Sequence, residues 1–176
     1  MVQITISGLP GSGTTTLVRR LCDSRLMTAL NGGDVFRDEA SKRGLSVASF
    51  SELCKSDPAV DYALDERLIE SMKESNGPDI IESRLAGWWA YREQIECHRI
   101  WLEVDIEERL RRVAIREGDD TRQLEESVIR EKADCQRYSR LYDIDILSME
   151  PYTSVIDSTN LTIDEVVEAV EDALNG

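Results

Sequence analysis

A glycine-rich segment near the start of the chain has the composition of a phosphate-binding loop. Residues 8–16 run Gly-Leu-Pro-Gly-Ser-Gly-Thr-Thr-Thr, after an apolar stretch at 2–6 and before a helical pattern at 14–24. Glycines let the backbone curl so that its N–H groups converge, and the following helix directs its positive dipole end at the same point. The segment therefore predicts a polyphosphate site, with an ordinary glycine-rich turn as the alternative.

The spacing of this loop matches the Walker A pattern G-x-x-x-x-G-K-[ST] at all but one position. Gly8 and Gly13 are the fixed glycines, and Thr15 supplies the hydroxyl on the magnesium side. Thr14 occupies the lysine position, and a threonine brings no positive charge to the β- and γ-phosphates. We therefore expect the charge that neutralises a transferring phosphoryl group to come from elsewhere in the chain.

A carboxylate and an arginine follow a second buried strand. Residues 79–82 form an apolar run that ends in Glu82, and Arg84 comes two residues later. Residues just past the ends of parallel strands line the binding crevice of an open α/β sheet, and a carboxylate there can hold magnesium through water. This arrangement resembles a Walker B strand, although Arg84 could also be a turn residue beside tryptophans that merely pack.

Arginines account for 17 of the 21 basic residues, and their planar guanidinium groups bind phosphate oxygens bidentately. Arg109, Arg112 and Arg116 recur at three- and four-residue intervals on one helical face. Arg130 and Arg137 are seven residues apart, which is two helical turns, and face the same way. The two helices predict a movable basic hairpin, with a solvated stripe as the alternative.

Residues 31–76 contain helix start signals and further candidate site residues. Asp34 is expected to cap a helix whose early turns carry Arg37, beside the paired glycines at 32 and 33. Asp57-Pro58 is a start signal for a helix over 59–74, on which Asp61 and Asp65 share a face. An arginine or a carboxylate pair in such a place is either solvated or in contact with substrate.

Alternating strands and helices must position these groups. Strands are predicted at 2–6, 26–30, 79–82, 99–104 and 153–157, and capping boxes are predicted at Asp105 with Glu108 and at Thr162 with Glu165. Ser46 is expected to cap a further helix. This alternation is typical of an α/β fold, with a parallel sheet covered by helices on both faces.

The bulk properties exclude several classes of protein. A chain of 176 residues with 41% hydrophobic residues is the size of one domain, and its net charge of −14 argues against binding to nucleic acid. It has no apolar run near the ~20 residues that span a bilayer and no charged leader, so we expect a cytoplasmic protein without membrane contact. The four cysteines lack a C-x-x-C pair, which predicts packed thiols. His98, the only histidine, is expected to be structural.

The sequence resembles the nucleoside monophosphate kinases, and most closely the archaeal type of cytidylate kinase. The resemblance covers nearly the whole length and is most specific around Arg84, in Ile81-Glu82-Ser83-Arg84-Leu85-Ala86-Gly87-Trp88. It implies a P-loop NTPase fold with a parallel five-stranded sheet, a helical NMP-binding insert and a lid. The core would comprise residues 1–30, 77–117 and 152–176, the insert residues 31–76 and the lid residues 118–151.

The resemblance also implies roles for particular residues. The ATP phosphates would be held by Gly8, Leu9, Pro10, Gly11, Ser12, Gly13, Thr14, Thr15 and Thr16, with Mg2+ at Thr15 and Glu82 and the adenine near residues 158–161. The acceptor nucleotide would be held by Gly33, Arg37, Asp61, Asp65, Arg84, Arg130 and Arg137. The catalytic guanidiniums would be those of Arg84, Arg112 and Arg116.

The implied reaction is phosphoryl transfer from ATP to CMP or dCMP by a monomer whose partners are nucleotides. Leu85 stands where bacterial cytidylate kinases have Asp, so their mode of base recognition does not carry over, and Asp61 and Asp65 become candidates for cytosine or ribose contacts. The alternatives are another acceptor, such as AMP, UMP, shikimate or gluconate, or a regulator that binds nucleotides without catalysis.

Overall fold

The computed structural model describes the backbone of residues 1–117 and 121–176, and the side chains of residues 55, 116–127 and 130 lie outside the described set. Within the described residues, five parallel strands form one sheet in the order β2-β3-β1-β4-β5. The strands are β1 (Ile4–Gly8), β2 (Ala29–Asn31), β3 (Ile80–Glu82), β4 (His98–Glu103) and β5 (Ser154–Asp157). The helices are α1 (Thr14–Arg25), α2 (Gly32–Lys42), α3 (Val47–Ser56), α4 (Pro58–Lys73), α5 (Ala86–Arg92), α6 (Ile106–Glu117), α7 (Thr121–Tyr142) and α8 (Ile163–Asn175).

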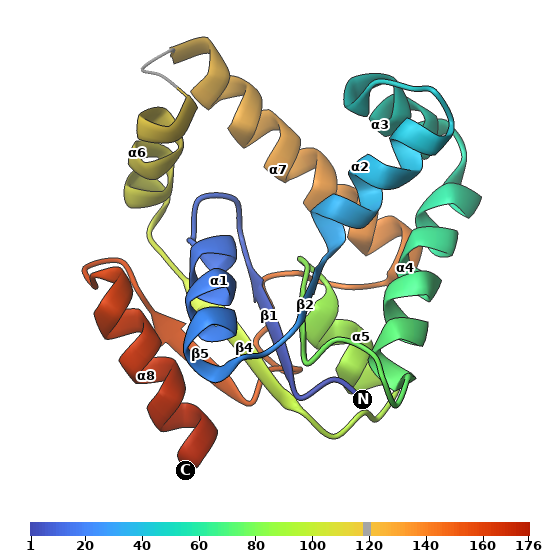
Figure 1. The fold of residues 1–176 in the computed structure, drawn as a ribbon. Coiled ribbons are helices and arrows are strands. Elements are labelled where there is room, and N and C mark those ends of the chain that lie inside the picture. The colour runs from blue at the N-terminus through green and yellow to red at the C-terminus, as the bar shows by residue number, and fades with distance from the viewer. Residues whose placement is uncertain (118–120) are drawn as a thin grey trace.

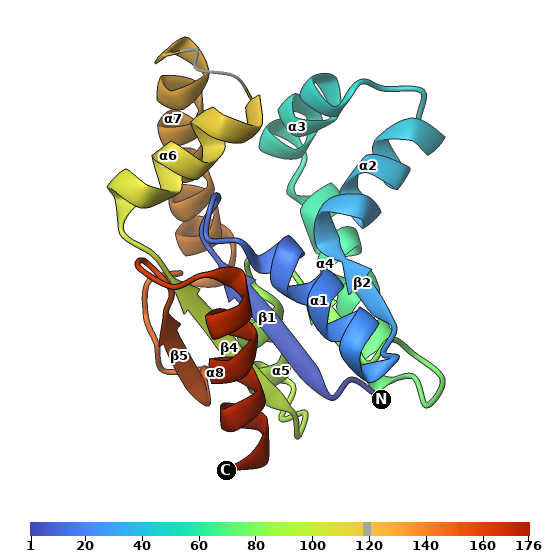
Figure 2. The ribbon, with the colours of Figure 1, turned by 60° about the vertical axis from the view of Figure 1, so that its left-hand side comes forward.

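Helices cover both faces of this sheet, as the sequence predicted (Figures 1 and 2). Ile4 and Ile6 of β1 point to the face covered by α1 and α8, where they pack with Leu17 and Val170. The opposite face is covered by α5, by part of α4 and by residues 144–152. This two-faced burial is what an all-parallel sheet requires. No helix of the described residues has the length and apolarity to span a membrane.

Helix α5 was not among the elements predicted from the sequence, which assigned no helix to the residues after Arg84. The structure begins a helix at Ala86, and the segment around Trp88 and Trp89 is buried. A Cβ at Gly87 would overlap the ring of Tyr152, so this position accepts only a glycine. Packing against the sheet therefore stabilises a helix whose glycine has poor helix propensity.

The expected start of α2 is also wrong by a few residues. Asn31, not Asp34, caps this helix, because its side-chain oxygen accepts from the backbone N–H groups of Gly33 and Asp34. Both glycines lie inside the first turn. The caps predicted at Ser46 and Asp57 are confirmed for α3 and α4.

Of the two predicted capping boxes, one is confirmed. Thr162 and Glu165 exchange both bonds at the start of α8. At the start of α6, the backbone N–H of Asp105 donates to Thr159 instead, and the carboxylate of Glu108 accepts from Arg111 and Arg112. Pairing with arginines one turn further along the helix thus replaces the reciprocal cap.

Two helical arms rise from the carboxyl ends of the strands. Helices α2, α3 and α4 connect β2 to β3, and α6 with α7 connects β4 towards β5. Figure 1 shows the loop between β1 and α1 lying between these two arms. The arms meet at their base, where the Tyr62 hydroxyl of α4 donates to the Leu141 carbonyl at 3.2 Å.

Candidate active site

A cleft of about 2320 Å³ lies between the two arms, above the glycine loop. The loop, the starts of α1 and α2, the end of β3 and the inner faces of α3, α4, α6 and α7 line it. Ser12 of the loop is buried, and the side chains of Arg116 and Arg130 lie outside the described residues. Residues 158–161, predicted to lie near the adenine, do not line this cleft. The cleft therefore gathers the other predicted residues: Gly8, Leu9, Pro10, Gly11, Gly13, Thr14, Thr15, Thr16, Gly33, Arg37, Asp61, Asp65, Glu82, Arg84, Arg112 and Arg137.

The curl of the loop depends on its glycines. Gly11 and Gly13 have φ angles of +87° and +93°, in the left-handed region that other residues rarely adopt. A Cβ on Gly11 would lie 2.6 Å from the backbone oxygen of Arg109, so the start of α6 supports the loop closely. A Cβ on Gly13 would meet only the Arg112 Nη1 atom, at 3.7 Å. The loop is thus braced at Gly11 and open at Gly13.

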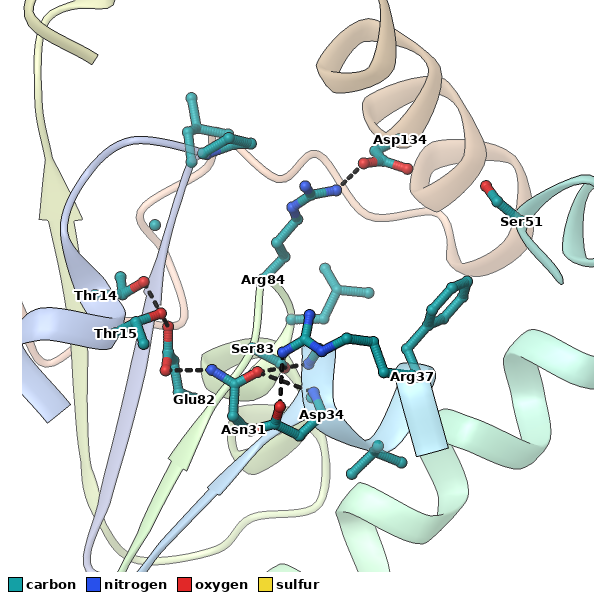
Figure 3. Close-up of a pocket in the computed structure, with 18 of the residues that line it drawn as sticks. Thr14, Thr15, Asn31, Asp34, Arg37, Ser51, Glu82, Ser83, Arg84 and Asp134 are labelled. Carbon is teal, nitrogen blue, oxygen red and sulfur yellow. Dashed lines mark hydrogen bonds and ion pairs between the residues drawn. The ribbon is translucent and has the colours of Figure 1, made fainter. Parts of the chain in front are cut away.

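Glu82 gathers hydrogen bonds from three neutral side chains at the edge of the cleft (Figure 3). Its Oε1 atom accepts from the hydroxyls of Thr14 at 2.6 Å and Thr15 at 2.8 Å. Its Oε2 atom accepts from Asn31 Nδ2 at 2.5 Å. Glu82 is 6% exposed, and no lysine or arginine among the described residues pairs with it. Its negative charge is therefore held in place without being neutralised.

This group of oxygens fits the expected magnesium ion. Mg2+ prefers oxygen ligands and usually takes one or two carboxylates together with substrate phosphates and waters. Glu82 and the Thr15 hydroxyl supply one carboxylate and one hydroxyl beside the glycine loop. The described residues hold no group of three or more His, Cys, Asp or Glu side chains that could hold a metal ion.

A network of charges crosses the opposite side of the cleft. Arg84, after β3, forms an ion pair with Asp134 of α7. Asp134 also forms an ion pair with Arg137 at 3.2 Å, and Arg137 lies 3.6 Å from Asp61 of α4. Arg84 and Arg137, two of the four arginines predicted for the acceptor, thus lie together, with carboxylates as their present partners. Sequence reasoning missed Asp134, although it precedes Arg137 by one helical turn.

Two buried polar atoms of this network have no partner among the described residues. They are the Oδ2 atom of Asp61 and the Nε atom of Arg137. Burial raises the pKa of the Asp61 carboxyl, and the charge of Arg137 opposes this rise. Since buried polar atoms normally find partners, these two are candidates to bond a ligand in the cleft.

Asp65 has a different environment from Asp61, although both line the cleft. Its two oxygens accept from Trp89 Nε1 at 3.2 Å and from the Tyr142 hydroxyl at 2.5 Å. Burial raises the pKa of this carboxyl to about 6, against the lowering effect of these two bonds. Burial, with the neighbouring Asp65 charge, also raises the pKa of the Tyr142 hydroxyl. Asp65 therefore joins α4, α5 and the end of α7.

Two arginines of the predicted face of α6, Arg109 and Arg112, have different contacts. Arg112 donates to the backbone carbonyls of Ser12 at 3.2 Å and of Ser158 at 2.9 Å, so it links the loop to the segment predicted to lie near adenine. Arg109 is buried, donates to the Pro10 carbonyl at 3.1 Å and forms a two-bond ion pair with Glu131 of α7. Arg109 therefore fixes the position of α7 against the loop.

Among the predicted acceptor residues whose side chains the structure describes, Arg37 is the most exposed. It lies one turn into α2 and pairs with Asp34 at 2.6 Å, with 58% of its side chain exposed. A Cβ on Gly33 would lie 3.2 Å from its Nη1 atom and 2.9 Å from Asn31 Oδ1. Gly33 thus leaves room for the Arg37 guanidinium over the first turn of the helix.

The sheet order, the glycine loop and the carboxylate on the adjacent strand together define a P-loop kinase fold. A family model described as an AAA domain matches residues 4–138. A shikimate kinase structure from Bacteroides thetaiotaomicron shares the fold, with a TM-score of 0.64, 15% identity and 99% coverage of each chain.

Relatives with higher sequence identity indicate which family within this fold class the chain belongs to. A cytidylate kinase of Methanospirillum hungatei is 39% identical over 98% of this chain and 96% of its own length. One of Methanocorpusculum labreanum is 37% identical over 99% and 97% of the two chains. The chain belongs to this family of archaeal cytidylate kinases, which confirms the resemblance inferred from the sequence.

Proposed function

We propose that the protein transfers the γ-phosphoryl group of ATP to CMP or dCMP, which yields ADP and the cytidine diphosphate. The observation that carries this proposal is the cleft, with a phosphate loop on one wall and paired arginines on the other, in a chain similar to cytidylate kinases over nearly its whole length. The products follow from attack by one acceptor phosphate oxygen on the γ-phosphorus, with the bond to the ADP oxygen breaking.

On the donor side, we assign the loop from Gly8 to Thr16 to the ATP phosphates, and residues 158–161 to the neighbourhood of the adenine. Thr15 and Glu82 would hold Mg2+, which supplies charge neutralisation to the β- and γ-phosphates when it is bound. Arg112 already contacts both the loop and Ser158, which supports its place along the bound ATP. The second lid guanidinium remains Arg116 in this proposal.

On the acceptor side, we assign the CMP phosphate to Arg37, Arg84 and Arg137, with Gly33 beneath it and Arg130 as a further member. A phosphate bound there would compete with the Asp134 carboxylate for Arg84 and Arg137. Asp61, with its unpartnered oxygen, is the better candidate for a contact to ribose or cytosine, because both oxygens of Asp65 are already used.

The chemistry needs alignment and charge more than proton transfer. The acceptor phosphate is itself a nucleophile, so the protein must hold it in line with the γ-phosphorus and stabilise the charge that moves. Water must also be excluded, because it would otherwise consume ATP. We therefore propose that the insert of residues 31–76 and the lid of residues 118–151 close over both substrates. We also propose that the protein acts as a monomer in the cytoplasm, where its substrates are found.

A coupled assay of ADP formation with CMP, dCMP, UMP, AMP and GMP tests this function. We expect kcat/KM for CMP to exceed that for AMP or GMP at least about tenfold, which corresponds to about 1.4 kcal/mol of transition-state discrimination. A reaction without acceptor measures background ATP hydrolysis. Equal rates with AMP would contradict the cytidylate assignment but leave the kinase, and ATP binding without any acceptor turnover would favour the non-catalytic regulator.

A further inference from the structure

Asn31 occupies the last position of β2, directly beside Glu82 of the neighbouring strand. The two residues are register partners in the parallel pairing of β2 with β3. Register partners project to the same face of a sheet, so their side chains meet at its carboxyl edge, as Figure 3 shows. The Asn31 amide therefore lies between the metal-side carboxylate and the start of α2.

Both ends of this amide are engaged, each with a different element. Its nitrogen donates to Glu82 Oε2 at 2.5 Å, and its oxygen accepts from the N–H groups of Gly33 at 2.7 Å and Asp34 at 3.2 Å. The partners fix the orientation of the amide, since only its oxygen can accept and only its nitrogen can donate. One side chain thus ties the first turn of α2 to Glu82.

Glu82 is in turn bound to the start of α1. Its second oxygen accepts from Thr14 and Thr15, which begin that helix directly after the glycine loop. Hydrogen bonds to an ionised carboxylate are shorter and stronger than those between neutral groups. A continuous chain of such bonds therefore runs from the phosphate loop, through Glu82 and Asn31, to the first turn of α2.

The first turn of α2 has little freedom to move apart from this chain. A Cβ on Gly32 would lie 2.8 Å from the Cβ of Ser83, so the turn packs tightly on the residue that follows Glu82. The same turn carries Gly33 and leads to Arg37, both of which we assign to the acceptor. A displacement of this turn by the acceptor therefore acts on Asn31 and, through it, on Glu82.

We propose that Asn31 is a positioning residue that couples the acceptor side of the cleft to the orientation of Glu82, so that CMP and Mg·ATP strengthen each other's binding. This inference rests on the proposed function, since it takes Glu82 as the metal-side carboxylate and α2 as the acceptor helix. The coupling is reciprocal: the factor by which one ligand improves the affinity for the other is the same in both directions.

The ratio of two dissociation constants measures this coupling without any turnover. Isothermal titration calorimetry gives the Kd of CMP without and with saturating Mg·AMP-PNP, a non-hydrolysable analogue of the donor. We expect the wild-type ratio to exceed about five, the low end of ordinary coupling between sites, and to fall to about one in Asn31→Ala. Asn31→Asp retains the oxygen that caps α2 but loses the bond donated to Glu82, so its ratio should fall equally.

Ser46→Ala provides the matched control, because it removes the cap of α3 in the same arm without touching Glu82. Its ratio should remain that of the wild type. If Asn31 served only as a cap, Asn31→Ala would weaken CMP binding equally with and without Mg·AMP-PNP, and the unchanged ratio would overturn the proposal. A wild-type ratio of one would overturn it as well. Failure of the wild type to bind CMP at all would instead contradict the proposed function.

Discussion

Thr14, at the position of the Walker A lysine, is hydrogen-bonded to Glu82, the carboxylate that would hold the metal. Its hydroxyl donates to Glu82 at 2.6 Å, next to the bond from Thr15. A lysine in its place would bring an ammonium group against the same carboxylate. If Glu82 holds the metal as we propose, the threonine supports it in that role, whereas a lysine would compete with the metal for the carboxylate.

Replacing Thr14 with lysine should accordingly fail to improve the enzyme. We expect Thr14→Lys to leave kcat unchanged or lower and to raise the Mg2+ concentration needed for half-maximal rate. Thr14→Ser, which keeps the hydroxyl, should behave as the wild type. Steady-state kinetics of the wild type and both variants over a range of Mg2+ concentrations would test this prediction. A steep gain in kcat for the lysine variant would show that the site lacks charge on the transferring group, as a strict Walker A comparison suggests.

At the scale of elements, the ion pair between Arg109 and Glu131 fastens α7 to α6 and the glycine loop. Arg109 is almost fully buried, so loss of its partner would leave a guanidinium without compensation. We expect Glu131→Ala to lower the free energy of unfolding by about 2 kcal/mol, within the range for a lost charged hydrogen bond. Urea denaturation measures this loss.

The exposed pair between Arg111 and Glu108 on the same helix is the matched control. Most of the Arg111 side chain is exposed, and surface pairs of this kind contribute between zero and about 1 kcal/mol. Arg111→Ala should therefore lower the free energy of unfolding clearly less than Glu131→Ala. Equal losses from the two variants would mean that the buried pair does not fasten α7.

The junction of α4, α5 and α7 should make stability depend on pH through Asp65. Its carboxyl has a pKa raised from 3.8 to about 6, so between these values the folded protein binds more protons than the unfolded chain. The free energy of unfolding should consequently fall as the pH rises from about 4 to above 6, by up to roughly 3 kcal/mol from this group. Denaturation curves at several pH values, for the wild type and Asp65→Asn, isolate this contribution as their difference. A difference that stays constant with pH would contradict the shifted pKa.

The elements that the sequence predicted well are those with a local signal. The loop spacing located Thr15, and the apolar run before Glu82 located β3, because both patterns involve neighbouring residues. Asn31 escaped notice because two glycines follow it and glycine is a poor helix former, so a turn was expected. What makes them helical is the tight packing of Gly32 against Ser83, fifty-one residues away.

Long-range partners explain the remaining differences. Asp134 joins Arg84 and Arg137 through a contact between α7 and the end of β3, which no spacing in the sequence reveals. Asp61 and Asp65 were predicted to share a helix face, which left open whether they are solvated or contact substrate, and both line the cleft. The structure uses both oxygens of Asp65 for Trp89 and Tyr142, which lie on two other helices. Pattern alone placed the two carboxylates together, and packing gave them different surroundings.

At the scale of the whole molecule, the two arms should move together when both substrates bind. The cleft of about 2320 Å³ is wide, and among the described side chains the arginine ion pairs that cross it involve Arg84 and Arg137, at residues 134–137 of α7 and at Asp61. We expect CMP with Mg·AMP-PNP to lower the radius of gyration towards the value of about 16 Å that is typical of a compact chain of this length. Either ligand alone should produce a smaller change, since water exclusion requires both arms. Small-angle X-ray scattering of the free protein, of each single-ligand complex and of the complex with both ligands measures this change in radius of gyration. Identical scattering curves would contradict closure.

The arm formed by α2, α3 and α4, which we propose to bind the acceptor, leaves the sheet after β2 and returns at its immediate neighbour β3. The segment between them can therefore change in sequence, or be exchanged between homologous enzymes, without altering the order of the strands. Glu82 and the glycine loop, which we propose to bind the donor, lie outside this segment and would stay unchanged. An insert between adjacent strands can therefore vary while the sheet that carries the glycine loop keeps its order.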